Sequence, residues 1–312
     1  MILVVGASGR LGSEVTRLLL AQGKTVRVMT RTPSKVDDLA SLGAEVVVGD
    51  LRDAESLRQA FRGIHQVVTT AHGYPGDGNN NPHTVDAIGN RRLIETAKAT
   101  GVSHFVFTSA LGARPDNPVD FLRIKYYVEQ MVRTNVLGYT ILRPAAFMES
   151  WIETIGKQIV EKGELTVYGR GDNPINFVSA DDVAKFAVLA LESPKVQGRV
   201  VEIGGPENLT FLQVAETLER IVGRSARRKY VSLLTMRIVA YFMFPINPAM
   251  SRQITAGVNM ASADMAFDPT PALNLLPMQL KRLEEVAERM YALPSNGLSP
   301  GAVKDLGVNG PG

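Results

Sequence analysis

Residues 1–12 read MILVVGASGRLG, and this stretch decides the fold. Ile2–Val5 is an apolar, β-branched run of the kind that forms a buried parallel strand. Glycines follow at positions 6, 9 and 12, and apolar residues then recur at helical spacing over residues 13–22, up to Gly23. A strand, a glycine turn and a helix in this order predict a cradle for a phosphate group, because the helix N-terminus offers free N–H groups and a positive dipole end.

Each glycine of the turn has its own role in such a cradle. Gly6 permits the tight turn, Gly9 lets the backbone approach a pyrophosphate, and Gly12 lets the helix pack close to the strand. The sequence therefore predicts a dinucleotide site that begins with Gly6, Ser8, Gly9, Arg10, Leu11 and Gly12.

The chain alternates between strand and helix patterns as far as about residue 223. Strands are predicted at 25–30, 45–48, 66–70, 102–108, 139–142 and 200–203, and helices at 54–61, 84–100, 120–133 and 211–222. This order predicts an α/β fold of the Rossmann type, with a doubly wound, mostly parallel sheet and a smaller C-terminal substrate-binding part. We expect an NAD(P)-binding domain at 1–150 with returning segments at about 175–205. The mainly substrate-binding part is expected at 151–312, where residues 292–312 form a flexible tail.

Composition excludes several classes of function. A hydrophobic fraction of 45% and a charged fraction of 21% over 312 residues are typical of a globular protein. The net charge is only +3, and we expect the basic cluster at 224–229 to be a solvated loop or an anion-facing edge, not a nucleic-acid surface. The absence of cysteine excludes disulfides and thiolate catalysis, and the four histidines lack metal-ligand spacing. Since a strand begins at Ile2, we expect no targeting segment and a cytoplasmic protein.

The end of the second predicted strand bears on cofactor choice. NAD-binding folds usually carry an Asp or Glu there, which accepts a hydrogen bond from the ribose 2′-hydroxyl. This chain has Thr30 and Arg31 instead, and a guanidinium can bind a 2′-phosphate that a carboxylate would repel. The sequence therefore predicts NADPH as the cofactor, with Arg31 on its 2′-phosphate and Arg10 as a second cation. The alternative is that Arg31 is only a solvated residue at a strand end.

Seven short segments support a family resemblance: GASGRLG, VRVMTR, VVVGDL, FVFTSA, YTILRP, DDVA and IGGPENLT. In content and order they resemble the atypical short-chain dehydrogenase/reductases, specifically the NmrA-like NAD(P)-binding branch, from residue 1 to about residue 223. The resemblance implies that Asp50 bonds the adenine amine and that Leu51 packs on the ring. It also implies that Pro144 and Phe147 lie along the nicotinamide. From the residues alone, Asp50 could also be the N-cap of the helix at 54–61.

The resemblance also implies catalytic residues, and one of them is missing. Short-chain reductases of the better-known kind use a Ser after the fifth strand and a Tyr-x-x-x-Lys on the next helix. This chain offers Ser109 and Lys125 in those roles, with Lys125 also holding the nicotinamide ribose, but Phe121 stands where the Tyr is expected. Tyr126 and Tyr127 lie about 100° and 200° further around the helix, so neither replaces the phenol. Alternatively, Lys125 forms only a surface i, i+4 pair with Glu129.

The fourth strand is followed by small residues and then by a long loop. We assign Thr70 and Ala71 to the cofactor site, because open α/β sheets bind ligands at the carboxyl ends of their strands. His72 is a weak candidate for a proton donor, since a lone loop histidine is more often structural. Residues 74–83 (YPGDGNNNPH) are predicted to form a mobile loop and a candidate lid.

Two apolar stretches remain open to more than one interpretation. Phe147, Met148 and Trp151 could form a soft wall for a planar acceptor, although a core position is favoured for each. Residues 233–246 (LLTMRIVAYFMFPI) are strongly apolar but too few to span a bilayer. A pocket or packing role is favoured for them over a dimer contact or an interfacial membrane helix.

The missing phenol shapes the functional prediction. Reduction of an ordinary ketone forms an alkoxide and needs a general acid. Reduction of a quinone or an activated double bond forms a delocalised anion, so positioning of the reactants can suffice. The sequence therefore predicts an NADPH-dependent oxidoreductase for a small apolar or quinone-like acceptor. The alternative is a non-catalytic NAD(P)-binding redox sensor or assembly protein, and a homodimer or a protein partner stays open for both.

Overall fold

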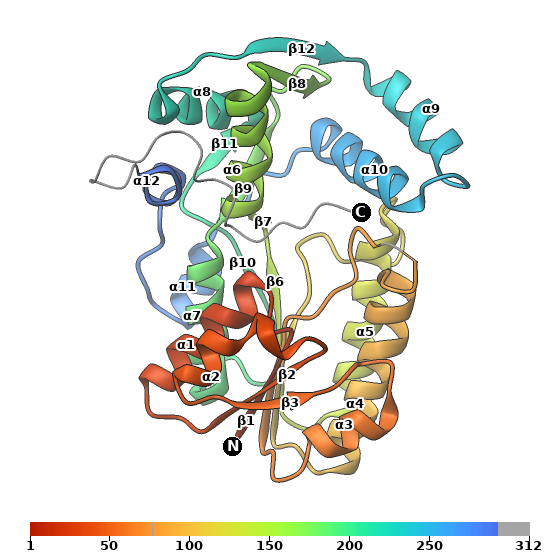
Figure 1. Ribbon diagram of the computed structural model, residues 1–312, viewed down its shortest axis with the longest axis vertical. Coiled ribbons are helices and arrows are strands. Elements are labelled where there is room, and N and C mark those ends of the chain that lie inside the picture. Colours follow the sequence, from red (N-terminus) through yellow and green to blue (C-terminus); the bar gives the residue numbers. More distant parts are fainter. Residues whose placement is uncertain (77, 293–312) are drawn as a thin grey trace.

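A central parallel sheet organises the protein (Figure 1), and the computed structural model describes residues 1–76 and 78–292. Its strand order is β10-β6-β5-β4-β1-β2-β3. The order reverses between β1 and β4, which is where doubly wound sheets bind their ligands. The strands are β1 (Ile2–Val5), β2 (Val26–Thr30), β3 (Glu45–Val48), β4 (Gln66–Thr69), β5 (His104–Thr108), β6 (Tyr139–Pro144) and β10 (Arg199–Ile203). The predicted fold class is confirmed.

Helices cover both faces of this sheet, because alternate side chains of each strand point to opposite faces. In β1, Val4 packs with α1, α2, α7 and α11, whereas Leu3 and Val5 pack with α3, α4 and α5. The first group is α1 (Arg10–Ala21), α2 (Asp37–Ser41), α7 (Ala180–Glu192) and α11 (Thr270–Leu275). The second is α3 (Ala54–Ala60), α4 (Asn90–Ala99) and α5 (Asp120–Asn135); the short helices η1 (Pro33–Lys35) and η2 (Pro82–Gly89) precede α2 and α4.

A smaller part lies beyond the carboxyl ends of the strands, at the top of Figure 1. One sheet contains β7 (Ala146–Phe147), β9 (Pro174–Val178) and β11 (Asn208–Thr210), and a second pairs β8 (Glu164–Tyr168) with β12 (Arg227–Val231). Their core is closed by α6 (Met148–Lys157), η3 (Gln158–Lys162), α8 (Phe211–Val222) and α12 (Leu283–Tyr291). The remaining helices, α9 (Leu233–Met243) and α10 (Pro248–Ser262), pack against each other at one side. The C-terminal tail expected at 292–312 lies almost wholly outside the described residues.

Some predicted boundaries were wrong for identifiable reasons. The first helix begins at Arg10, not at residue 13, because Gly9 has the extended backbone of an N-cap and the chain turns into the helix directly after it. The predicted loop at 74–83 ends at Asn81, whose side chain accepts from the backbone N–H groups of His83 and Thr84 and so starts a helix at Pro82. Asp53, not Asp50, caps α3, since its carboxylate accepts from the backbone N–H of Glu55.

The two apolar stretches, residues 147–151 and 233–246, differ in how far their side chains are buried. Met148 is fully buried in the core of the smaller part, and Trp151 packs edge-on against Phe177. Phe147 instead lines the main cavity. A pocket or packing role was favoured for residues 233–246. Packing is confined to few of them, because Ala240 is the one buried residue of α9, and four of them (Arg237, Ala240, Tyr241 and Phe244) line a second hollow. No helix in residues 1–76 and 78–292 is long and apolar enough to cross a bilayer.

Candidate functional site

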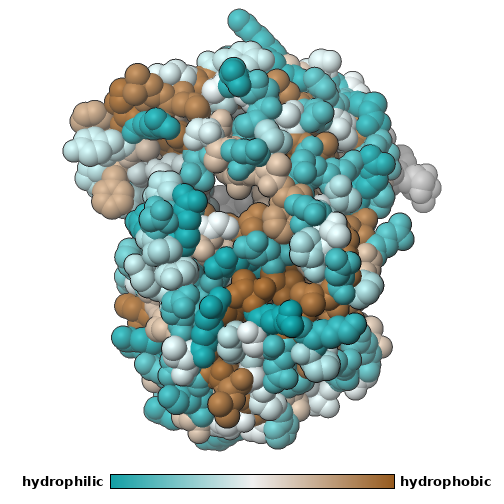
Figure 2. All heavy atoms as spheres, turned by 180° about the vertical axis from the view of Figure 1, so that it is seen from behind, coloured by the Kyte–Doolittle hydropathy of each residue, from teal (hydrophilic) through white to brown (hydrophobic). Residues whose placement is uncertain are grey.

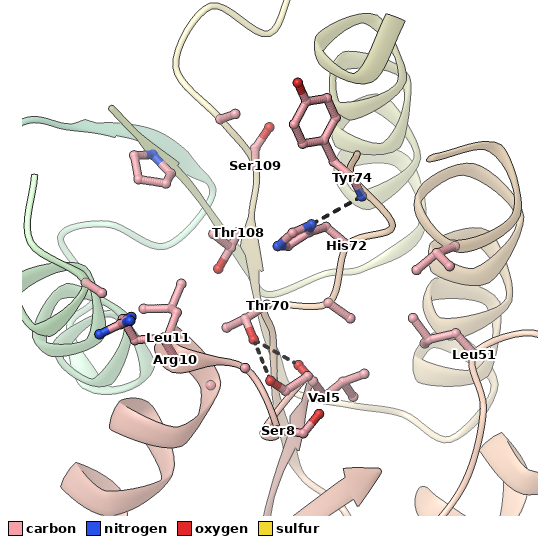
Figure 3. A pocket seen from close by; sticks show the side chains of 18 of the residues that line it. Val5, Ser8, Arg10, Leu11, Leu51, Thr70, His72, Tyr74, Thr108 and Ser109 are labelled. Carbon is pink, nitrogen blue, oxygen red and sulfur yellow. Dashed lines mark hydrogen bonds between the residues drawn. The ribbon is translucent and has the colours of Figure 1, made fainter. Parts of the chain in front are cut away.

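A cavity of about 520 Å³ opens at the carboxyl ends of the central strands, where the strand order reverses. Figure 3 shows the glycine turn and α1 on one side of it and His72, Tyr74 and Ser109 further along. The structure brings every site residue predicted from the sequence into the lining of this cavity. These are Gly6, Ser8, Gly9, Arg10, Leu11, Gly12, Arg31, Asp50, Leu51, Thr70, Ala71, Ser109, Lys125, Pro144 and Phe147.

The three glycines of the turn differ in what a side chain would meet. Gly6 has a φ of +89°, and a Cβ there would lie 2.8 Å from the backbone N of Ala71. A Cβ on Gly12 would lie 2.3 Å from the carbonyl oxygen of Gly6. A Cβ on Gly9 would lie 3.4 Å from the carbonyl oxygen of Gly6, and no other atom of the described residues beyond its chain neighbours would lie within 4 Å of it. The bare backbone at Gly6 and Gly12 is thus needed by the fold, whereas at Gly9 it leaves room in the cavity for a ligand.

The N-terminus of α1 lies at this side of the cavity. No side chain of residues 1–76 and 78–292 caps it, and its first turn contains no acidic residue. The side-chain hydroxyl of Thr70 lies 3.3 Å from the carbonyl oxygens of both Val5 and Gly6 and ties the turn to β4 (Figure 3). Helix N–H groups that are not capped attract anions. The turn therefore fits the pyrophosphate of a dinucleotide.

Arg31 at the end of β2 adds a positive charge to the cavity wall. Arg31 is exposed, and its guanidinium donates to the Asn80 side-chain oxygen at 3.2 Å. Asp50 stands at the end of the neighbouring strand, where Arg52 donates to its carboxylate from the side chain at 2.5 Å and from the backbone N–H at 2.8 Å. These hydrogen bonds from Arg52, together with the charge of Arg31, hold the pKa of Asp50 below its ordinary value. Arg52 was not predicted, and it compensates Asp50, the one acidic residue that the described part of the chain places in the cavity wall.

Lys125 is buried, so the alternative of a surface pair with Glu129 was wrong. Its ammonium lies 3.1 Å from a carboxylate oxygen of Asp86 and donates to the Thr108 carbonyl oxygen at 3.1 Å. It also lies over the rings of Phe107 and Phe121, at 5.0 Å and 5.3 Å from their centroids. An ammonium has three N–H donors, so one is left for a group in the cavity.

Ser109 belongs to a second buried network. Its hydroxyl donates to Glu129 at 2.5 Å, and Arg143 donates to both oxygens of the same carboxylate at 2.7 Å and 2.8 Å. Glu129 is completely buried. A serine hydroxyl has a single proton to give, so while it is bonded to Glu129 it can only accept a hydrogen bond from a ligand.

Aromatic rings line the cavity next to Lys125. The Tyr74 ring lies 5.0 Å from the Phe121 ring, centroid to centroid, and its phenol donates to the carbonyl oxygen of Arg252 at 3.3 Å. Burial, with the nearby charge of Asp120, raises the pKa of Tyr74 to about 12. The His72 ring is reached by solvent in the cavity but is surrounded by protein. Desolvation, and then the charge of Lys125, lowers the pKa of His72, so the ring is neutral near pH 7.

Sequence reasoning missed three of these partners. Asp86 and Tyr74 had no recognised role, and Glu129 was weighed only as a surface partner of Lys125. The one available signal was chemical: a lysine that lies in an apolar setting needs a carboxylate close by. Nothing in the local pattern says which carboxylate that is.

Comparison with known proteins gives four findings. A profile of the family described as NAD(P)H-binding matches residues 6–194. The NAD(P)H azoreductase of Xenophilus azovorans is 32% identical over 234 residues, which are 75% of this chain and 78% of that protein. The photosystem II assembly factor Ycf39 of Synechocystis sp. is 31% identical over 242 residues, 77% of this chain and 73% of that protein. Among solved structures, the NADPH-dependent quinone oxidoreductase QOR2 of Escherichia coli, complexed with NADPH, superimposes with a TM-score of 0.76. It is 22% identical, over 93% of this chain and 100% of that chain, and shows the shared fold.

Proposed function

The chain belongs to the NAD(P)H-binding family of atypical short-chain dehydrogenase/reductases, and we propose on this premise that it is an NADPH-dependent oxidoreductase. The acceptor that we propose is quinone-like, or otherwise an activated apolar molecule. The observation that carries the proposal is a single cavity of about 520 Å³ with a phosphate cradle at one end and aromatic rings beside a buried lysine at the other.

In this proposal each part of the cavity holds one part of the cofactor. The pyrophosphate lies against the N-terminus of α1 at Gly9, and Arg31 binds the 2′-phosphate. The remaining N–H of Lys125 bonds the nicotinamide ribose. Asp50 and Leu51, which line the cavity, would hold the adenine, and Pro144 and Phe147 would hold the nicotinamide. Bound NADPH would supply the hydride.

The donors in the cavity wall favour an acceptor that needs little help from an acid. Phe121 has no proton to give, and the Ser109 proton is engaged by Glu129. The Tyr74 phenol has a pKa of about 12 and bonds the Arg252 carbonyl oxygen. Hydride addition to a quinone or to an activated double bond gives an anion that delocalises its own charge, so these residues would contribute by orienting the acceptor and excluding water.

The same observations support a second candidate function, a dinucleotide-binding protein without catalysis. Two observations support this candidate. Among the described residues of the cavity wall we find no side chain that is free to act as a general acid, and the Synechocystis relative is named as an assembly factor. In this case Lys125 and Ser109 would serve only to bind the cofactor and to hold the fold.

One assay separates the two candidates. NADPH oxidation is followed at its absorbance band with benzoquinones, naphthoquinones, enones and azo compounds, alongside calorimetric binding of NADPH to the same preparation. The reductase proposal expects turnover with at least one of these acceptors and none with simple ketones. Tight NADPH binding without turnover across the panel would favour the second candidate.

Three further assignments belong to this proposal. We place the NAD(P)-binding domain at 1–150, with returning segments at about 175–205, and the mainly substrate-binding part from residue 151 onward. We assign the protein to the cytoplasm, because it would draw on the NADPH of that compartment. A second copy or a protein partner is compatible with either candidate function.

A further inference from the structure

Large apolar side chains gather on the outside of α9 and on the turn into α10, which we call the α9–α10 hairpin (residues 233–262). Figure 2 shows a hydrophobic patch at the upper corner of the molecule where α9 lies. Tyr241 and Ile246 are each 76% exposed and Phe242 is 66% exposed. The other exposed large apolar residues of the hairpin are Leu234, Ile238, Val239, Phe244 and Met250.

The packing of α9 against α10 buries few of the side chains on the inner side of α9. Ala240 is the single buried residue of that helix, and a hollow of about 440 Å³ lies between α9, α10 and Pro118. A patch of this kind on a folded protein marks a surface that meets something else. Its composition shows what that is.

The segment that contains the hairpin is uniformly basic. Residues 224–263 include Arg224, Arg227, Arg228, Lys229, Arg237 and Arg252 and not one Asp or Glu. Arg227, Lys229 and Arg237 are exposed, and the Lys229 ammonium pairs with Glu164 of β8. The strand β12 carries the first two and runs through Ser232 straight into α9. An apolar helix with exposed aromatic side chains and a basic flank is typical of a segment that lies in the interface of an anionic membrane.

We propose that the α9–α10 hairpin docks the protein on the surface of a membrane with anionic headgroups. Phe242, Phe244 and Ile246 would enter the headgroup region, while Arg227 and Arg237 meet lipid phosphates. A second copy of the chain is a poorer occupant, because a two-fold contact would bring together two hairpins that each carry Arg237 and Arg252 and no acidic residue. Fluid acyl chains also fill around side chains of unequal size, so they need no complementary groove.

The hairpin is joined to the cavity described above. Arg252 of α10 pairs with Asp120 at 3.1 Å, and its carbonyl oxygen accepts the Tyr74 hydrogen bond. Docking would therefore hold the aromatic end of the cavity close to the bilayer, where apolar acceptors dissolve. This last step rests on the proposed function, whereas the docking itself does not.

The test is sedimentation of the full chain with vesicles of phosphatidylcholine alone and with vesicles that also contain phosphatidylglycerol. We expect binding to the anionic vesicles that weakens at high salt. Changing Phe242→Ser and Ile246→Ser together should weaken binding by about tenfold or more, because both side chains lose their burial in lipid. Changing Arg227→Gln and Arg237→Gln should weaken it by about fivefold for each charge removed.

The matched control is Leu137→Ser with Tyr127→Ser, which removes two exposed apolar side chains on α5 and just after it, outside the hairpin, and should leave vesicle binding unchanged. NADPH binding is measured on every variant as a check of folding and as a separate reading of the cofactor site. Vesicle binding that the hairpin changes do not weaken, or no binding at all, overturns the docking proposal. A dimer in solution that the hairpin changes dissociate, without vesicle binding, overturns it in favour of a second copy. In each of these cases intact NADPH turnover leaves the proposed function standing.

Discussion

Substitution of the three turn glycines by valine should separate cofactor binding from folding. Gly9 has a φ of −93°, which any residue adopts, and a Cβ there meets only one atom, at 3.4 Å. Gly6 and Gly12 lack this freedom, since the first has a positive φ and the second would press a Cβ to 2.3 Å from a backbone oxygen. We therefore expect Gly9→Val to keep the fold and lose the cofactor, and the other two changes to damage the fold itself.

The magnitudes follow from the local geometry. Gly9→Val changes an N-cap without a side-chain bond and should lower the free energy of unfolding by no more than about 1 kcal/mol. At Gly6 a left-handed backbone alone costs about 1–2 kcal/mol for a side chain. At Gly12 overpacking adds about 1–3 kcal/mol. If the valine at position 9 prevents two charged hydrogen bonds to the pyrophosphate, NADPH binding loses about 3–6 kcal/mol, which is about a hundredfold to ten-thousandfold in Kd.

Calorimetric titration with NADPH and chemical unfolding of the same samples measure both quantities. Among the three valine variants, Gly9→Val should lose the least stability. It should also lose the most NADPH affinity relative to the stability that it loses. Two results would refute it. One is wild-type NADPH affinity in Gly9→Val, which would mean that the turn holds no pyrophosphate. The other is an unfolded Gly9→Val, which would mean that the space beside Gly9 is needed by the chain.

Three more predictions concern single side chains. We expect the wild type to bind NADPH about tenfold to hundredfold more tightly than NADH, and Arg31→Ala should remove most of this preference by weakening NADPH binding alone. Titration of both cofactors measures this, and an equal loss of affinity for both would show that Arg31 does not bind the 2′-phosphate. Lys125→Ala should lower the free energy of unfolding by about 3–5 kcal/mol because it strands the buried Asp86, whereas the exposed Tyr127→Phe should change neither stability nor NADPH binding. Burial holds the pKa of His104 below its ordinary value, so near that pKa the unfolded chain binds more protons than the folded chain. The stability that neutral His104 contributes is complete above about pH 6.5 and is lost as the pH falls towards the folded pKa. His104→Gln should flatten this decline in urea unfolding measured between pH 7.5 and 5, and an unchanged slope would contradict the assignment.

The local pattern was enough for the large sheet and the outline of the site. Strand β1, the glycine turn and α1 are contiguous, so their geometry follows from nearest neighbours along the chain. Residues as far apart as Gly9, Arg31, Ser109 and Phe147 could be assigned to one cavity because each follows a parallel strand, and the carboxyl ends of such strands share one edge.

What the local pattern could not supply is the partner of each polar group. Lys125 pairs with Asp86 on another helix, and Ser109 gives its proton to Glu129, which Arg143 of β6 also holds. A carboxylate that is buried and one that is solvated look the same in a sequence. Which of them sits beside a given lysine depends on how the two helices pack.

The sequence by itself therefore determined the parallel sheet, the phosphate cradle and the basic strand end, because periodicity and turn chemistry act over a few neighbouring residues. Only the tertiary structure decided that Lys125 is buried, that the Ser109 proton is engaged and that α9 stays uncovered. Burial and pairing are set by contacts between segments far apart in the chain, and an apolar helix carries the same pattern whether it meets a core or faces outward.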